Sequence, residues 1–113
     1  MSGAGLRRLR RGVAAGVLAA WIGTTWAADP AAGRTKAGAC EACHGADGLG
    51  VQPNVPNLAG QPEIYLAEQL RLYRGGKRVH EVMNVVAKPL ADRDIDDLAA
   101  WFASIRVQAQ VPK

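Results

Sequence analysis

The chain has 113 residues, of which 49% are hydrophobic and only 5% aromatic, and it carries 14 lysines and arginines against 10 acidic residues. This length allows one small domain and excludes a second folded unit of ordinary size. Four of the basic residues precede residue 12, which leaves 10 basic against 10 acidic side chains in the rest of the chain. The charge therefore gives no support for nucleic-acid binding.

Residues 1–27 have the composition of an export signal peptide. Arg7, Arg8, Arg10 and Arg11 precede an apolar stretch at residues 13–26, which is shorter than the roughly 17–25 residues of a membrane-spanning helix. Small residues at positions 25 and 27 predict cleavage after Ala27 and export to the periplasm. The alternative is an uncleaved membrane anchor. Residues 28–113 are expected to form a single domain.

Three helices are expected in this domain, and no strand pattern is present, so the predicted fold is all-α. The first helix covers about residues 33–43. The second opens at Pro62 and stops at residues 75–76, and its predicted buried stripe is Leu66, Leu70 and Tyr73. The last begins near Asp92. Its expected core face has helical spacing and consists of Ile95, Leu98, Ala99, Phe102 and Ile105.

Two long segments without a periodic pattern separate these helices, at residues 45–61 and 75–90, with at most one short helical turn around residues 82–87. Loops of this length are uncommon in a small domain unless they have a function, and wrapping a flat cofactor is one. Two cysteines three apart build no disulfide framework. The domain has four aromatic residues, so a buried cofactor is expected to supply part of its core.

The sequence Cys40-Glu41-Ala42-Cys43-His44 has the C-x-x-C-H spacing of covalent haem attachment. Two thiols three residues apart can each form a thioether with one vinyl group of the same haem. His44 then lies within reach of the iron. The motif predicts haem c bound through Cys40 and Cys43, with His44 as one iron ligand.

Three other interpretations of the cysteine pair are open. A redox-active C-x-x-C of the thioredoxin type requires a βαβ setting, and no strand is predicted before the motif. A zinc site could be formed by Cys40, Cys43, His44 and His80, although the adjacent Cys43 and His44 do not match the usual ligand spacing. A structural disulfide explains neither the histidine nor the long loops.

The second axial ligand of a haem iron is commonly methionine or histidine. Met1 would leave with the signal peptide, so Met83, in a predicted polar loop, is the favoured ligand. His80 is the competing ligand, and an open position is the third possibility. Methionine and histidine together raise the reduction potential.

From residue 33 to residue 105 the chain resembles the small bacterial class I c-type cytochromes. Five segments carry the resemblance, in the order CEACHG, PNLAGQ, YLAEQLRLYRGGKR, VMNVVAKPL and DRDIDDLAAWFASI. It implies the class I cytochrome c fold, with three main helices and haem-wrapping loops, and Met83 as the distal ligand. It also implies that the Pro56 carbonyl accepts a hydrogen bond from His44, and that the first and last helices cross near Trp101 or Phe102.

The motif and the resemblance together predict a monomeric single-haem electron carrier, not an enzyme. Its expected partners are redox proteins, including membrane-bound complexes: a quinol-side donor and a terminal oxidase or reductase. One alternative is a haem subunit of a larger membrane or periplasmic oxidoreductase complex. The other is a ligand-binding or peroxidatic haem protein with an open iron position.

Charged residues gather at two predicted helix ends. Arg71, Arg74, Lys77 and Arg78 end the second helix, and the last helix begins with Asp92, Asp94, Asp96 and Asp97. Each sign complements the helix macrodipole, so solvated helix ends are the simplest interpretation. The alternative is that one cluster borders an exposed haem edge and steers a partner of opposite charge.

Overall fold

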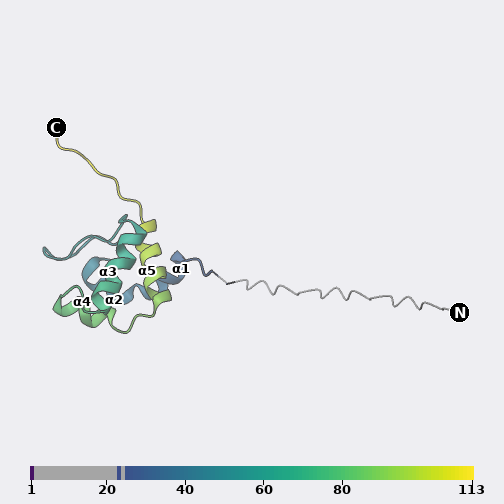
Figure 1. Cartoon of the computed structure of the whole chain (residues 1–113). Helices are drawn as coiled ribbons and strands as arrows, with labels where there is room; N and C mark the ends of the chain where they lie inside the picture. Colours follow the sequence, from purple (N-terminus) through teal and green to yellow (C-terminus); the bar gives the residue numbers. More distant parts are fainter. Residues whose placement is uncertain (2–22, 24) are drawn as a thin grey trace.

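The computed structural model describes Met1, Gly23 and residues 25–113, so most of the predicted signal peptide lies outside the described residues. The described part contains helices and no strand, which confirms the all-α prediction. The helices are α1 (Pro30–Lys36), α2 (Gly38–His44), α3 (Glu63–Arg74), α4 (Glu81–Ala87) and α5 (Asp92–Ser104). Figure 1 shows them gathered into one body, from which residues 106–113 extend. None of these helices is both long and apolar enough to cross a membrane.

The helix predicted at residues 33–43 is two helices, and it starts earlier than predicted. Asp29 begins α1 by accepting a hydrogen bond from the Ala31 N–H at 2.9 Å, and Pro30 occupies the first helical position. Ala37 then separates α1 from α2. Its side chain is fully buried, so the break depends on packing and leaves no signal in the alanine-rich sequence.

The buried faces of α3 and α5 agree with the predicted ones, with small differences. In α5, Ile95, Leu98, Ala99 and Phe102 are all 3% exposed or less, and Ile105 follows the helix end and is half-buried. In α3, Leu66 and its neighbour Ala67 are buried, whereas Leu70 and Tyr73 are half-buried. α5 packs against both α1 and α3, and α4 packs against α3. The central helix of the domain is therefore α5.

The buried core is built largely from small side chains. Its members are Ala37, Leu66, Ala67, Ile95, Leu98, Ala99 and Phe102. Only one of these is aromatic, and three are alanines. A core of this size gives limited stability to a domain of fewer than 90 residues, which agrees with the expectation that a cofactor completes it.

α1 and α5 cross in very close contact at Gly33. A methyl group placed on Gly33 would lie 1.9 Å from the Asp97 carbonyl oxygen and 2.8 Å from the Trp101 Cβ. Glycine is therefore the residue that lets the two backbones approach. Trp101 lies at the crossing, as the resemblance implies.

Replacing Gly33 with alanine is expected to destabilise the holoprotein by about 3 kcal/mol, because the added methyl meets backbone that cannot move without separating α1 from α5. Gly38→Ala is the matched control, since a methyl there meets no atom within 4 Å. That variant should be neutral or slightly stabilised by the higher helix propensity of alanine. Denaturant unfolding of both holoproteins measures the difference, and equal stabilities would contradict the crossing.

Candidate functional site

The cysteine pair and the histidine of the motif lie in the last part of α2. Cys40 and Cys43 are free, half-buried thiols separated by about one helical turn, and His44 is the last residue of the helix. Burial raises the pKa of the Cys40 thiol, and the negative charge of Glu41 raises it further.

The imidazole of His44 is buried, with 8% of the residue exposed, and one of its nitrogens has a fixed partner. Nδ1 lies 2.8 Å from the Pro56 carbonyl oxygen. Because a carbonyl can only accept, Nδ1–H donates this hydrogen bond to the Pro56 oxygen, and in the neutral ring Nε2 is then the nitrogen with the lone pair. The ring is thus in the tautomer that a metal ligand of the Nε2 type requires.

The loop after α2 is held in place by its own hydrogen bonds. Gly45 leaves the helix with φ of +79°, and an added side chain there would meet the Leu49 carbonyl oxygen. The Gly48 carbonyl accepts from the N–H groups of Leu58 and Ala59, at 2.7 and 3.0 Å. These contacts fold the loop back on itself and bring the Pro56 carbonyl to His44.

The same loop is joined to the last helix. The Gly60 N–H donates to the Phe102 carbonyl of α5 at 2.9 Å. A Cβ at Gly48 would lie 3.1 Å from the Phe102 ring, so the loop backbone also packs against that side chain. The segment predicted as an irregular loop is therefore attached at both α2 and α5.

Met83 is the third residue of α4 and is half-buried, so it lies in a seven-residue helix where the sequence predicted a polar loop with at most one helical turn. His80 caps the start of this helix: its Nδ1 accepts from the N–H groups of Val82 and Met83, each at 3.3 Å. Histidine is an unusual cap, which is why the sequence predicted only one turn here. The structure thus gives His80, the competing ligand candidate, a structural role in α4.

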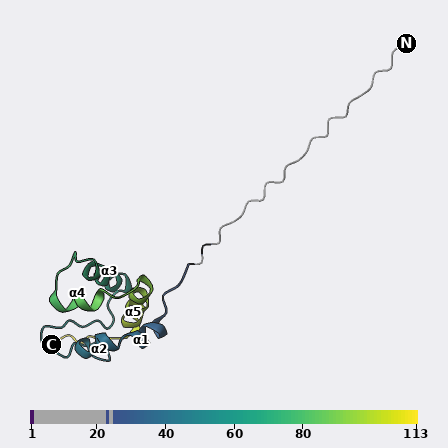
Figure 2. The ribbon, with the colours of Figure 1, turned by 90° about the horizontal axis from the view of Figure 1, so that it is seen from below.

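Asn84 is a positioning residue that the sequence reasoning missed. Its side-chain oxygen accepts from the His80 N–H at 2.7 Å, and its side-chain nitrogen donates to the carbonyls of Tyr73 and Arg78, at 2.7 and 2.8 Å. Asn84 therefore ties α4 to the end of α3. Figure 2 shows α4 beside α3, and α2 next to α1.

Two members of each charged cluster pair with each other across the contact between α3 and α5. Arg71 binds Asp96, and Arg74 binds both Asp92, at 2.6 Å, and the Leu90 carbonyl, at 2.9 Å. The interpretation as separate solvated helix ends is thus only partly correct. Reversing the charge of Arg74 would disturb this contact, so that change is a poor probe of partner steering.

The other interpretations of the motif receive no structural support. Among the described residues no three of the histidine, cysteine, aspartate and glutamate side chains are grouped so as to hold a metal ion, so the four candidate zinc ligands are not brought together. No strand precedes the cysteine pair in the part that the structure describes. Two half-buried thiols on one helical turn and a histidine with a free Nε2 fit a covalently attached haem.

The family model described as cytochrome c matches residues 30–106. The chain belongs to the cytochrome c family, and it is a small bacterial cytochrome of class I. This confirms the predicted class I fold and the predicted cofactor, covalently bound haem c, for which Cys40 and Cys43 provide the fitting motif.

Two relatives and one solved structure illustrate the similarity. Cytochrome c4 from Pseudomonas aeruginosa is 50% identical over 78 residues, which are 69% of this chain and 39% of that protein. Cytochrome c-554(548) from Halomonas halodenitrificans is 46% identical over 81 residues, which are 69% of this chain and 98% of that protein. A thiosulfate dehydrogenase structure from Marichromatium purpuratum matches 68% of this chain and 19% of that one, at 38% identity and a TM-score of 0.64.

The chain therefore spans less than half of the cytochrome c4 relative and almost the whole of the cytochrome c-554(548) relative.

Proposed function

We propose that this chain is a single-haem electron carrier and not an enzyme, with haem c attached through Cys40 and Cys43 and His44 and Met83 as the axial iron ligands. When bound, the haem supplies a one-electron redox couple. The observation that carries the proposal is the buried His44 ring, whose Nδ1 is 2.8 Å from the Pro56 carbonyl directly after a half-buried cysteine pair.

The chain's own residues fix both proposed ligands. The hydrogen bond to Pro56 orients the His44 imidazole and makes its other nitrogen a stronger donor. Met83 is held by α4, which His80 caps and Asn84 ties to α3. If His44 and Met83 both bound the iron, no coordination position would be left for a substrate. Such a site would suit a carrier that accepts and releases one electron with little rearrangement of its own atoms.

The proposal is tested by the mass and the redox behaviour of protein matured in a host that attaches haem. The intact mass should include one haem, and a potentiometric titration should follow a single one-electron step. The reduced protein should pass electrons to an acceptor protein without binding carbon monoxide. A mass without added haem would contradict the proposal, and so would catalytic turnover of a small-molecule substrate such as thiosulfate.

Redox proteins are the partners that such a carrier requires, and we propose a quinol-side donor and a terminal oxidase or reductase, with the carrier acting as a monomer. The matched thiosulfate dehydrogenase structure favours a second candidate, a haem unit that serves a larger oxidoreductase. Stopped-flow mixing with a purified thiosulfate dehydrogenase distinguishes the two. Rapid thiosulfate-dependent reduction of the haem in a stable complex would support the second candidate, and slow second-order reduction without a complex would support the free carrier.

We further propose that residues 1–27 direct export to the periplasm and are removed after Ala27, which leaves residues 28–113 as the mature domain. The arginines before residue 12, the short apolar stretch and the small residues at 25 and 27 support this. Intact mass of the protein expressed with its own leader gives the first residue directly. Retention of residues 13–26 would instead indicate a membrane anchor.

A further inference from the structure

Asp97 is a buried carboxylate that the proposed haem chemistry does not use. The residue is 0% exposed. From the sequence, the aspartate-rich start of α5 was expected to be a solvated helix end. Its Oδ1 accepts from the Asp29 N–H at 2.8 Å, and its Oδ2 accepts from the Lys36 ammonium at 2.8 Å. The hydrogen bond from Lys36, followed by that from Asp29, holds the pKa of Asp97 below its usual range. The buried Asp97 carboxylate of α5 thus binds the backbone just before α1.

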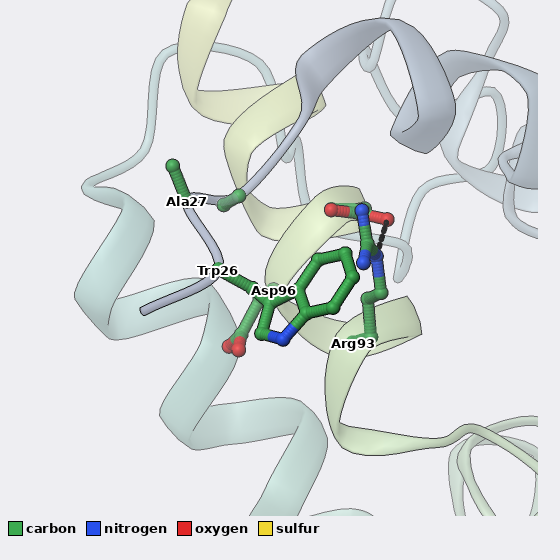
Figure 3. A pocket seen from close by; sticks show the side chains of 6 residues that line it. Trp26, Ala27, Arg93 and Asp96 are labelled. Atoms are coloured by element: carbon green, nitrogen blue, oxygen red, sulfur yellow. Dashed lines mark ion pairs between the residues drawn. The ribbon is translucent and has the colours of Figure 1, made fainter. Parts of the chain in front are cut away.

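A pocket lies directly beside this carboxylate, where the predicted cleavage point meets α5 (Figure 3). Its lining consists of Trp26, Ala27, Ala28, Arg93, Asp96 and Asp97. The Trp26 ring lies against Arg93, whose guanidinium carbon is 4.4 Å from the ring centroid. Trp26 is 74% exposed, so it covers the pocket without belonging to the core. Two of the six lining residues are on the leader side of the predicted cleavage point.

Cleavage after Ala27 would change the chemistry of this pocket. Hydrolysis breaks the bond between the Ala27 carbonyl carbon and the Ala28 nitrogen and consumes one water. The Ala27 carboxylate leaves with the leader, and the Ala28 nitrogen takes up protons and becomes an ammonium. The reaction thus removes the Trp26 side chain from above Arg93 and creates a positive charge beside two aspartates.

We propose that the Ala28 ammonium released by signal cleavage binds the carboxylates of Asp96 and Asp97, and so fastens the new chain start to α5. The inference rests on the proposed processing of the leader. The Ala28 nitrogen is three covalent bonds from the Asp29 nitrogen, which already donates to Asp97 at 2.8 Å. Ala28 also lines the same pocket as Asp96 and Asp97.

The other charges around the pocket leave room for this contact. Arg71 of α3 binds Oδ1 of Asp96, and Oδ2 of Asp96 has no hydrogen bond among the described residues. Lys36 of α1 is shared between Asp97 and Asp94, and the Arg93 Nε is 3.7 Å from Asp97. An Asp96 oxygen and the shared Asp97 oxygens are therefore the acceptors that the ammonium would use.

The test compares two holoproteins whose only difference is the position of the amine. Each is exported behind a leader that is native to the expression host. Cleavage of that leader gives one chain that starts at Ala28 and one that carries a single glycine before Ala28. Intact mass verifies both starts. An ordinary α-amine has a pKa of about 7.7–8.0. NMR titration should show a pKa about one unit higher for the Ala28 start, and the ordinary value for the glycine start.

The stability difference has a defined pH dependence. A raised amine pKa stabilises the fold fully below the ordinary pKa of about 7.7, and that stabilisation is lost as the pH rises through the raised value. The Ala28 start should therefore melt about 5 °C higher than the glycine start at pH 6, and at the same temperature at pH 10.5. Equal melting temperatures at pH 6 would overturn the proposal.

Two substitutions identify the partner of the amine. Asp96→Asn should reduce the difference between the two starts at pH 6 by at least about half, because it removes the negative charge of one of the two carboxylates. Asp92→Asn is the matched control, since Asp92 pairs with Arg74 outside the pocket and its loss should leave the difference unchanged. An effect of Asp92→Asn equal to that of Asp96→Asn would overturn the assignment.

Because both chains carry the host's leader, the result of this test does not depend on how the protein's own leader is processed. If protein made with its own leader retains Trp26, the processing step is wrong, and the proposal is overturned for the natural protein even where the engineered chains show the ion pair. If the natural chain starts at Ala28 but its amine titrates with an ordinary pKa, the processing stands and the docking is wrong.

Discussion

Replacing Met83 with alanine is expected to convert the low-spin optical spectrum of the holoprotein to a high-spin one and to allow carbon monoxide to bind. Met83 is the only methionine outside the predicted signal peptide, and alanine cannot coordinate iron. The proposed thioether ligand would be lost while the His44 to Pro56 contact stays in place. The absorption spectrum of the oxidised protein and carbon monoxide titration of the reduced protein measure the change. The reduction potential should also fall by roughly 0.1 V or more, since methionine ligation raises it.

His80→Ala is the matched control for this experiment. Its imidazole caps α4, so its removal should loosen the helix at a cost of about 1 kcal/mol and leave the spectrum low-spin. The reverse pattern, a high-spin spectrum for His80→Ala and a normal one for Met83→Ala, would show that His80 is the ligand. A wild-type spectrum that is already high-spin would indicate an open position.

Replacing both Cys40 and Cys43 with alanine is expected to leave the mature chain largely unfolded. Without covalent haem the core holds only seven buried side chains in its main cluster, three of them alanine methyl groups. That burial offsets too little of the conformational entropy lost on folding. Far-ultraviolet circular dichroism should show the loss of more than about half of the helical signal, without a cooperative thermal transition.

Ala42→Ser provides the control, because it changes an exposed residue of the same helix and keeps both thiols. It should attach haem and melt cooperatively. Native-like helix content in the double variant would mean that the polypeptide supplies its own core, and the haem would then be an addition to a domain that folds without it.

The sequence predicted well the elements whose pattern is local. The face of α5 and the limits of α3 followed from helical periodicity and from Pro62 and Gly75, and the structure confirms both within one or two residues. The break at Ala37 and the length of α4 could not be predicted in this way. The first depends on the packing of a buried alanine, and the second on a histidine cap.

The buried Asp97 was missed for a similar reason. It lies among three other aspartates, and what distinguishes it is contact with Asp29 and Lys36, which are 68 and 61 residues away along the chain. No local pattern carries such information. The contact between His44 and Pro56 likewise spans 12 residues of irregular loop, and only the resemblance to known cytochromes indicated it.

The hydrogen bond from Gly60 to Phe102 links two parts of the chain that lie far apart in the sequence. It joins the loop that carries Pro56 to the end of α5, so the support of the His44 ring and the C-terminal helix share one backbone contact. A substitution that displaces the Phe102 carbonyl would remove one attachment of the loop that orients the His44 imidazole.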